Sequence, residues 1–415
     1  MKLGLIGEKL PHSYSKRIFE DILNYPSYDL VELKREALSD FITTTDLVAF
    51  NVTVPYKTDI IPLLKGIDER AKRIGAVNAV RREAGGFYGT NTDYDGLRIL
   101  LLQSGIPIQG KSVLILGTGG TSKTAAVVCA DLGARKIVKV SRRKSENAIS
   151  YAEAPFAGGE VIINTTPCGM YPKTGEFPVN LRDFSEIFGV VDVIYNPLNT
   201  ALIRQAKELG IPAVSGLLML AGQAVAAEAF FLGKTLTNEQ LQKRAVEMEK
   251  KLRGEIENLI LTGMPGVGKT TVGTLLAKER NCPFYDTDVE LEKTIGSIPD
   301  FIRFNGEEAF RNAESTVIAD LLKNARGAVI ATGGGAVLRE ENRQALSENG
   351  YVILLERSAD TIVFDQSRPL SDNPEKWDQL WQRRASVYRA FADLTVAEFQ
   401  TAEEACRRIL EGLEK

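Results

Sequence analysis

The sequence predicts an α/β protein with several domains, and three observations support this fold class. Short apolar runs alternate with helix-like stretches along most of the 415 residues, which is typical of parallel sheets covered by helices on both faces. Two of these runs lead into glycine-rich turns, at Gly117 and Gly263, where backbone N–H groups can approach phosphates at a helix N-terminus. The length fits two to four domains of roughly 100–200 residues each.

The composition excludes several classes of protein. The formal net charge is −3, so no large basic surface is expected to attract nucleic acid. No window approaches the roughly 18 unbroken apolar residues of a membrane span, and the first residues lack the apolar core of a signal peptide. Four scattered cysteines show no C-x-x-C spacing, and the single histidine, His12, excludes a histidine-rich metal site. We therefore expect a cytoplasmic protein acting on small molecules, as a monomer or small homo-oligomer.

The first hundred residues alternate between strand and helix signals. The runs KLGLIG (2–7) and VAFNVTV (48–54) predict buried strands, and Pro55 follows the second. Helical patterns occur at 16–23 and in GIDERAKRI (66–74). This alternation predicts a parallel sheet.

A second set of elements starts with VLILG (113–117). A glycine turn and the helical stretch TAAVVCADLGA (124–134) follow it, and KIVKVSRR (136–143) predicts the next strand. EVIINTTP (160–167) and VVDVIYNP (190–197) are two further apolar strands, each ending at proline. The connection between them and KIVKVSRR is short, so we expect this domain to lack a helix and a strand.

The chain becomes charged and helical between residues 237 and 256. This stretch has few large apolar residues and no strand signal, so it predicts a terminal helix and a linker. The run LILTG (259–263) then restarts the strand–turn–helix pattern.

The first glycine turn resembles a dinucleotide-binding turn. In VLILGTGGTSK, glycines at the start of a helix allow the backbone to approach a pyrophosphate. A basic cluster at the end of the next strand, with no carboxylate, favours the 2′-phosphate of NADP over the ribose hydroxyls of NAD. The residues expected to bind NADPH or NADP are Gly117, Gly119, Gly120, Thr121, Ser141, Arg142 and Arg143.

The second turn, GMPGVGKTT, fits the pattern G-x-x-x-x-G-K-[ST] from Gly263 to Thr270. Its backbone N–H groups would surround phosphate oxygens, Lys269 would reach the β- and γ-phosphates of ATP, and Thr270 would hold Mg²⁺. The residues expected to bind this nucleotide are Gly263, Gly266, Gly268, Lys269, Thr270 and Thr271.

Charged residues downstream of this turn suggest an acceptor site. Asp286 and Asp288 lie two apart after an apolar run, so on a strand end they would share one face. Arg311 and Glu314 are three apart, on one face of a predicted helix. Three consecutive glycines, 333–335, offer a strip free of side chains against which a small ligand could lie. Arg368 and Arg384 add positive charge.

Residues from about 1 to 236 resemble shikimate dehydrogenase. PHSYSK, NVTVPYK, GAVNAV, GTNTDYDG, INTTPCGMYP, DVIYNP and GLLMLAGQAV occur in the order of that family. The resemblance implies that Lys57 and Asp93 form a catalytic pair, with Lys57 as proton donor. It also implies a substrate site made of Ser13, Ser15, Thr53, Asn78, Tyr195 and Gln223.

Residues from about 257 to 415 resemble shikimate kinase. The P-loop, D-T-D, F-R-x-x-E, G-G-G, R-P-L and R-x-x-x-Y-x-x-x-A follow in that family's order. The resemblance implies that Asp286 lies near Mg²⁺, Asp288 takes the proton of the acceptor hydroxyl and Arg368 stabilises the transferred phosphoryl group. The acceptor would be bound by Arg311, Gly333, Gly334, Gly335 and Arg384.

Together these resemblances imply a bifunctional enzyme of the shikimate pathway. Residues 1–101 and 214–236 would form the substrate domain and 102–213 a Rossmann-like NADP domain. Residues 237–256 would link them to a P-loop domain of the nucleoside-monophosphate-kinase type at 257–415. The expected reactions are NADPH-dependent reduction of 3-dehydroshikimate and ATP-dependent phosphorylation of shikimate. Two alternatives remain open: a quinate/shikimate dehydrogenase that uses NAD, fused to the kinase, and a non-catalytic sensor of shikimate or nucleotides.

Overall fold

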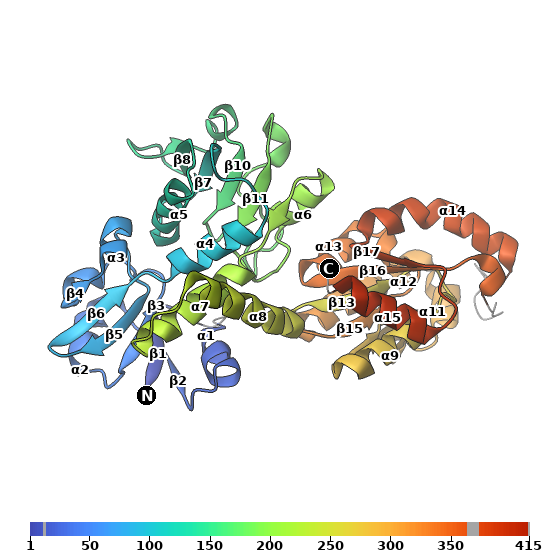
Figure 1. The fold of residues 1–415 in the computed structure, drawn as a ribbon. Helices are drawn as coiled ribbons and strands as arrows, with labels where there is room; N and C mark the ends of the chain where they lie inside the picture. Colours follow the sequence, from blue (N-terminus) through green and yellow to red (C-terminus); the bar gives the residue numbers. More distant parts are fainter. Residues whose placement is uncertain (11–13, 363–372, 414–415) are drawn as a thin grey trace. The chain divides into compact units, whose positions relative to one another are not determined.

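The computed structural model describes residues 1–10, 14–362 and 373–413. Its backbone contacts divide the chain into two compact units, Met1–Leu252 and Arg253–Lys415 (Figure 1). Ser13 and Arg368, two of the predicted site residues, lie outside the described residues. No helix in the described part of the chain is long and apolar enough to cross a membrane.

The first sheet of the N-terminal unit is mixed, which corrects the expectation of a parallel sheet. Its strands have the order β2-β1-β3-β5-β6-β4, and β5 pairs antiparallel with both β3 and β6. The reason is the turn between β5 and β6, where Gly85 and Gly86 have φ of 91° and 144°, because so short a connection can only join antiparallel strands. The strands are β1 Leu3–Gly7, β2 Tyr28–Glu32, β3 Ala49–Val52, β4 Gly66–Ile67, β5 Ala79–Glu83 and β6 Gly86–Thr90.

The second sheet has the order β12-β11-β10-β7-β8-β9, and each neighbouring pair of strands in it is parallel. The chain leaves β7 toward β8 on one side and later returns to β10 on the other. The carboxyl ends of β7 and β10 therefore form a topological switch point, where α/β sheets bind ligands. The strands are β7 Ser112–Leu116, β8 Lys136–Ser141, β9 Ile149–Ser150, β10 Val161–Asn164, β11 Gly189–Asp192 and β12 Ala213–Val214.

The short connection from β8 to β10 contains no α-helix, as expected from its length. It does contain a strand, the two-residue β9, followed by a single 3₁₀ turn at Ala154–Phe156. The sheet thus keeps its sixth strand in reduced form.

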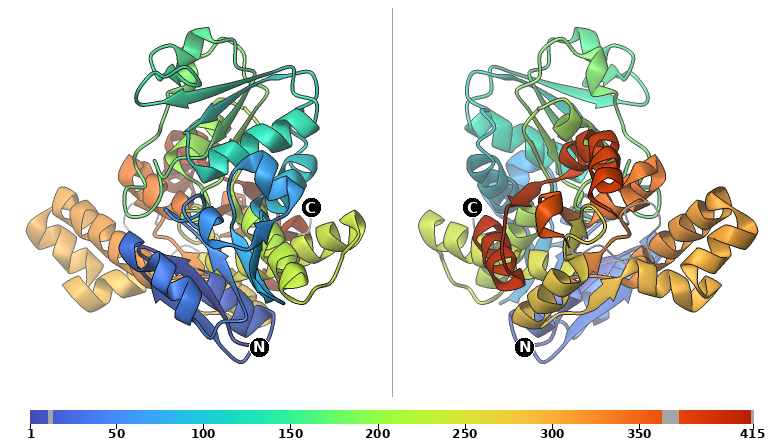
Figure 2. Two further views of the ribbon diagram at one scale, coloured as in Figure 1. Left: turned by 90° about the vertical axis from the view of Figure 1, so that its left-hand side faces the viewer. Right: turned by 90° about the vertical axis from the view of Figure 1, so that its right-hand side faces the viewer.

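Two helices, α4 (Asp93–Gln103) and α7 (Leu217–Phe231), pack together between the two sheets of this unit (Figure 1). They approach closely because both contain glycine at the crossing: a Cβ on Gly96 would lie 2.3 Å from Met219 O, and one on Gly222 would lie 2.9 Å from the Gly96 Cα. Figure 2 shows the blue first sheet and the teal-green second sheet from the sides. The other helical segments are α1 Ser15–Arg17, the π-helix Ile18–Ile22, α2 Leu38–Thr44, α3 Glu69–Ile74, α5 Gly120–Asp131, α6 Ala201–Glu208 and 3₁₀ turns at Arg35–Ala37, Ile61–Leu63 and Leu181–Asp183.

The charged stretch predicted as a helix and a linker is one continuous helix, α8 (Asn238–Ile256). Its four buried apolar residues, Ala245, Met248, Leu252 and Ile256, recur at spacings of three and four and therefore form one narrow stripe. The boundary between the two compact units falls within this helix.

The C-terminal unit contains a five-stranded parallel sheet of order β14-β15-β13-β16-β17. Alternate residues of the central strand β13 enter two cores, with Leu259 and Leu261 in one and Ile260 in the other. The strands are β13 Asn258–Thr262, β14 Phe284–Asp286, β15 Val329–Ala331, β16 Gly350–Glu356 and β17 Leu394–Ala397. The helices are α9 Lys269–Arg280, α10 Thr287–Ile295, α11 Ile298–Asn305, α12 Glu307–Asn324, α13 Glu340–Glu348, α14 Pro374–Phe391, α15 Ala402–Leu413 and 3₁₀ turns at Ala336–Leu338 and Ala359–Thr361.

Candidate functional sites

A buried lysine–aspartate pair forms the centre of the N-terminal site. Lys57 follows β3 and Asp93 begins α4, and Lys57 Nζ lies 2.6 Å from Asp93 Oδ2. Their side chains are only 14% and 8% exposed. The second carboxylate oxygen accepts a hydrogen bond from Asn78 Nδ2 at 2.8 Å. The carboxylate is therefore fixed from two sides, and it fixes the lysine ammonium in turn.

Asn78, predicted to line the substrate pocket, lies directly behind this pair. It is buried, and its amide oxygen accepts from Thr92 N at 2.6 Å. Its backbone carbonyl accepts from Asn51 Nδ2 at 3.2 Å, and Asn51 Oδ1 accepts from Tyr28 OH at 2.7 Å. This chain of buried hydrogen bonds positions Asp93, a task that sequence motifs alone did not reveal.

The other described substrate residues lie on separate elements around the site. Thr53 and Ser15 are half-buried, and Ser15 hydrogen-bonds Tyr28. Tyr195 packs edge-on against Tyr14, with ring centroids 5.8 Å apart, and burial raises the pKa of Tyr195 to about 12. Gln223 in α7 donates to Leu220 O at 3.1 Å. Their role in substrate binding stays a prediction.

The first glycine turn lies beside Lys57. Gly117 has φ of 111°, and a Cβ there would lie 2.8 Å from Thr165 Oγ1, so this position needs glycine. Gly119 caps helix α5, and a Cβ on Gly120 would lie 3.4 Å from Lys57 Cδ. Thr121 follows in the first helical turn. A pyrophosphate bound at this helix N-terminus would thus bring its dinucleotide close to the lysine.

The basic cluster follows directly after β8. Ser141 ends the strand and donates to Arg143 O, while the Arg142 and Arg143 side chains are exposed. Lys144 pairs with Glu153, and its hydrogen bond is the largest of the effects that lower the pKa of Glu153 to about 2. The arginines therefore remain the cations available to a 2′-phosphate.

The second glycine turn has the backbone of a phosphate-binding loop. Gly263, Gly266 and Gly268 all have positive φ, between 85° and 141°, which lets successive N–H groups point inward. Lys269 begins helix α9, and its Nζ donates to Gly263 O at 2.9 Å and to Met264 O at 3.0 Å. Thr271 follows it on the exposed side of the first turn.

The residues predicted to hold Mg²⁺ lie together. Thr270 Oγ1 donates to Asp286 Oδ2 at 2.6 Å, so two hard oxygen ligands of the kind that Mg²⁺ prefers are adjacent. No group of three or more His, Cys, Asp or Glu side chains in residues 1–10, 14–362 and 373–413 could hold a metal. A magnesium ion here would therefore also need water and nucleotide oxygens, as is usual for this ion.

Asp286 and Asp288 do not share a strand, and this part of the prediction was wrong. β14 ends at Asp286, which caps α10 by accepting from Asp288 N at 3.0 Å. Aspartate is favoured at a helix N-cap and in the first turn, and this preference outweighs the strand pattern. The Asp288 carboxylate instead faces the glycine strip: a Cβ on Gly333 would lie 2.4 Å from its Oδ1.

Two arginines meet the same glycine strip. A Cβ on Gly335 would lie 2.4 Å from Arg311 Nη1, and Arg384 Nη1 donates to Gly334 O at 3.2 Å. Arg311 is paired with Glu314 at 2.8 Å, as its spacing in α12 predicted. Burial raises the pKa of Glu314. The absence of side chains on the strip therefore lets Asp288 and Arg311 approach its backbone. Arg384 is held there by its hydrogen bond to Gly334 O.

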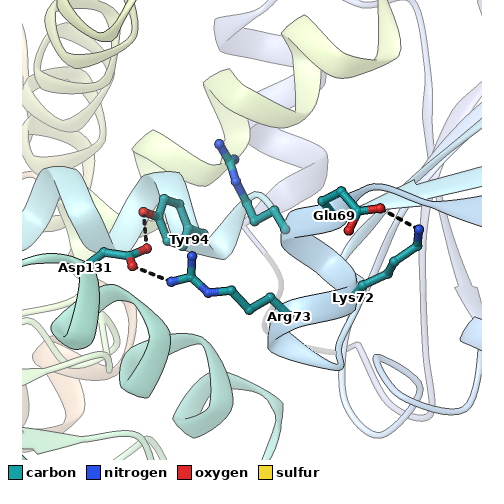
Figure 3. Close-up of a pocket in the computed structure, with 6 residues that line it drawn as sticks. Glu69, Lys72, Arg73, Tyr94 and Asp131 are labelled. Atoms are coloured by element: carbon teal, nitrogen blue, oxygen red, sulfur yellow. Dashed lines mark hydrogen bonds and ion pairs between the residues drawn. The ribbon is translucent and has the colours of Figure 1, made fainter.

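A separate pocket of about 610 Å³ lies at α3, α4 and the end of α5 (Figure 3). Its charged side chains largely satisfy one another: Tyr94 OH donates to Asp131 Oδ2 at 2.8 Å, Arg73 pairs with Asp131, and Lys72 pairs with Glu69. It contains none of the predicted site residues.

The folds and sites define a two-unit α/β protein in which a dinucleotide-type unit with a lysine–aspartate pair precedes a P-loop phosphotransferase unit. Family models agree: "Shikimate dehydrogenase substrate binding domain" matches residues 5–80 and "Shikimate kinase" matches residues 265–414. The chain belongs to the shikimate dehydrogenase family and carries a shikimate kinase domain C-terminal to it. It is therefore a bifunctional enzyme of the shikimate pathway, as the motifs predicted.

Individual relatives cover the N-terminal unit. A shikimate dehydrogenase (NADP(+)) from Clostridium beijerinckii is 37% identical over 255 residues, which are 58% of this chain and 94% of the relative. A chorismate mutase/shikimate 5-dehydrogenase fusion protein from Clostridium acetobutylicum is 34% identical, with a TM-score of 0.56 over 60% of this chain and 98% of that one. Shikimate dehydrogenase 1 from Peptoclostridium difficile is 36% identical, with a TM-score of 0.55 over 60% and 99%.

Proposed function

We propose that the N-terminal unit reduces 3-dehydroshikimate to shikimate with NADPH, and that the C-terminal unit phosphorylates shikimate to shikimate 3-phosphate with ATP. The observation that carries the first half is the buried Lys57–Asp93 pair beside the turn at Gly120. The direction is supported by the fusion itself, since consumption of shikimate by the second reaction would draw the first one forward.

In the reductive step NADPH supplies the hydride. Lys57 Nζ gives a proton to the carbonyl oxygen as this becomes the hydroxyl of shikimate, and the amine then recovers a proton from solvent. Asp93 holds the lysine ammonium at one oxygen and accepts from Asn78 at the other. A group held in this way is oriented before the substrate arrives.

In the phosphoryl transfer, ATP supplies the phosphoryl group and Mg²⁺ would neutralise its charge. Thr270 and Asp286 are the residues that would hold the ion. Asp288, beside the glycine strip, would accept the proton of the attacking hydroxyl, and Arg311 and Arg384 would bind the acceptor carboxylate. Lys269 would move from the loop carbonyls to the phosphates, because an ammonium binds an anion more strongly than a neutral oxygen.

Two assays on the intact chain test this proposal. NADPH oxidation should require 3-dehydroshikimate, and ATP consumption should require shikimate and Mg²⁺. Parallel measurements with NADH and with quinate decide between NADP-dependent and quinate-type activity, and the names of the relatives favour NADP. Binding of shikimate and nucleotides without turnover in either assay would instead indicate a sensor.

The four cysteines are free in the structure. Free thiols support the further proposal that the protein works in the reducing cytoplasm. We also propose that it is a monomer or small homo-oligomer, which sedimentation analysis would establish.

A further inference from the structure

The phosphate-binding loop requires hydrogen-bond donors on its outer side. When its N–H groups turn inward around phosphates, its carbonyl groups must turn outward, and a buried carbonyl without a partner is costly. Gly263 O and Met264 O accept from Lys269 Nζ. Pro265 O accepts from the indole N–H of Trp377, at 3.0 Å from Nε1. Lys269, a residue of the loop itself, and Trp377, which lies 112 positions away in the chain, therefore both donate to loop carbonyls.

Trp377 lies near the start of helix α14 and packs into the core. It is 3% exposed, and its backbone N–H donates to Asn373 O at 3.0 Å in the first turn of the helix. Trp381 stacks on it with ring centroids 6.2 Å apart, and Tyr388 stacks on Trp381 at 6.1 Å. The indole N–H is thus a donor with a fixed position.

The same helix also holds the acceptor strip. Tyr388 OH contacts Gly334 O and lies 3.3 Å from Gly263 O. Burial raises the pKa of Tyr388 to about 12, so this hydroxyl stays a donor near neutral pH. The strip and the loop touch directly as well, since a Cβ on Gly334 would lie 2.8 Å from Pro265 Cδ. Helix α14 therefore contacts both sides of the reaction centre.

The two kinds of donor respond differently to a nucleotide. A triphosphate competes with the loop carbonyls for the Lys269 ammonium. When the ammonium moves to the phosphates, the carbonyls of Gly263 and Met264 lose its hydrogen bonds. The indole N–H of Trp377 is uncharged and already committed to Pro265 O. We therefore expect this bond to persist when the lysine moves.

We propose that Trp377 is a positioning residue that holds the phosphate-binding loop in its nucleotide-binding conformation through Pro265. The inference rests on the proposed ATP-dependent activity of this unit. It predicts that Trp377 affects the binding of the nucleotide and not the binding of the acceptor.

The test compares Trp377→Phe with Trp381→Phe in the full-length protein. Both changes keep an aromatic ring in the stack, but only the first removes the N–H donor to the loop. Trp377→Phe should raise the KM for ATP about three- to tenfold, the effect of losing one neutral hydrogen bond. Its kcat and its KM for shikimate should stay within about twofold of wild type, as should all parameters of Trp381→Phe. An equal KM for ATP in the two variants would overturn the proposal.

Tryptophan fluorescence gives a second readout, because the chain has only two tryptophans. In Trp381→Phe the single remaining indole is Trp377. ATP brings negative charge to the loop that this indole contacts, so its emission should change with ATP concentration even though the bond to Pro265 O persists, and half of the change should be reached at the Kd. Unchanged emission at saturating ATP would contradict a contact that senses the loop. A lower melting temperature of Trp377→Phe, together with losses in every kinetic parameter, would show a general role in the core and would also overturn the proposal.

Calorimetric titration with ATP separates this inference from the proposed function. A wild-type protein that binds ATP but does not phosphorylate shikimate would refute the kinase activity, and the Kd of Trp377→Phe would still test the loop. A wild-type protein that does not bind ATP would overturn both.

Discussion

Single residues show how far local sequence determines a site. Arg311 and Glu314 are three apart in a helix, so their pairing follows from helix geometry. Lys57 and Asp93 are brought together by tertiary packing, and their pairing could be expected only from the family's motifs. The contact between Trp377 and Pro265 has neither signal, because the residues are far apart in the chain and a tryptophan in a helix resembles an ordinary core residue.

Asp192, at the end of β11, is a residue whose behaviour only the structure reveals. It is fully buried, and it accepts from Asn164 Nδ2 at 3.0 Å, from Ile194 N at 3.1 Å and from Thr200 Oγ1 at 2.8 Å. Burial is the largest effect and raises its pKa to about 7. In the unfolded chain the carboxyl group has its ordinary pKa of 3.8. The folded state thus binds the proton more tightly, so this contribution to stability is present at low pH and is lost as the pH rises through about 7.

We therefore predict that Asp192→Asn removes a pH dependence of stability. Relative to this variant, wild type should lose about 2 kcal/mol of unfolding free energy between pH 5.5 and pH 8. Both tryptophans lie in the other unit, so their fluorescence would not report unfolding of the unit that contains Asp192. Urea midpoints of residual dehydrogenase activity measure the effect instead. Asp183→Asn, at an exposed position of the same sheet domain, is the control and should follow wild type. Parallel curves for wild type and Asp192→Asn would contradict the assignment.

The second prediction at this scale concerns the exposed Arg142 and the choice of cofactor. Arg142→Ala should weaken NADP binding about 10- to 100-fold and NAD binding little, because a charge-assisted contact to the 2′-phosphate contributes roughly 1.5–3 kcal/mol. Titration with both cofactors measures the two Kd values. Arg182→Ala removes another exposed arginine of this domain and should change neither. Equal losses for NADP and NAD would sink the role of Arg142.

At the scale of elements, the sequence predicted strands and turns well and their boundaries less well. The apolar runs before both glycine turns are strands β7 and β13, because buried parallel strands are apolar throughout. The antiparallel pair β5–β6 departs from the expected parallel sheet, because the two glycines of its Ala-Gly-Gly turn allow a very short connection between the strands. The linker expected within residues 237–256 is instead part of helix α8, because four apolar residues among many charges still form a complete buried stripe.

The glycine strip, residues 333–335, supports a prediction about backbone access. Gly335 has φ of −101°, so alanine fits its backbone, but the new Cβ would displace the Arg311 guanidinium. Gly335→Ala should therefore raise the KM for shikimate roughly tenfold and leave that for ATP nearly unchanged. Arg311→Ala should show the same selectivity.

The control for this change is Gly254→Ala. That glycine lies in helix α8, and its Cβ would meet only an ordinary contact at 3.8 Å with Arg280. Steady-state kinetics with each substrate varied in turn make the comparison. If Gly335→Ala impaired ATP more than shikimate, the strip would belong to the nucleotide site.

The whole molecule joins two units that each contain a core and a set of reactive residues. The Lys57–Asp93 pair and its glycine turn lie within residues 1–252, and the P-loop, the aspartates and the described arginines lie within 253–415. The end of α8 belongs to the second unit, since a Cβ on Gly327 would lie 2.7 Å from Gly254 O. The described site residues of each predicted activity thus lie within one unit.

We therefore predict two independent activities. Lys57→Ala should lower dehydrogenase turnover by about 10²- to 10⁴-fold, the usual contribution of a general acid, and leave kinase turnover near wild type. Lys269→Ala should do the reverse, because it removes the cation at the phosphates. Separately expressed pieces 1–252 and 253–415 should each be soluble and active, as expected for units with their own cores. A Lys57→Ala protein without kinase activity would contradict independence.

Independence also predicts how shikimate passes between the sites. A small polar product released into solvent mixes with the bulk pool, and a covalent tether between two enzymes does not by itself prevent this. When labelled 3-dehydroshikimate, NADPH and ATP are supplied together with excess unlabelled shikimate, the label in shikimate 3-phosphate should fall in proportion to the dilution. An equimolar mixture of the pieces 1–252 and 253–415 is the matched control, because it lacks the tether but has the same sites, and it should give the same dilution. If the intact chain passed its label undiluted while the mixture did not, the shikimate would be transferred directly, and the two units would have to be treated as one catalytic assembly.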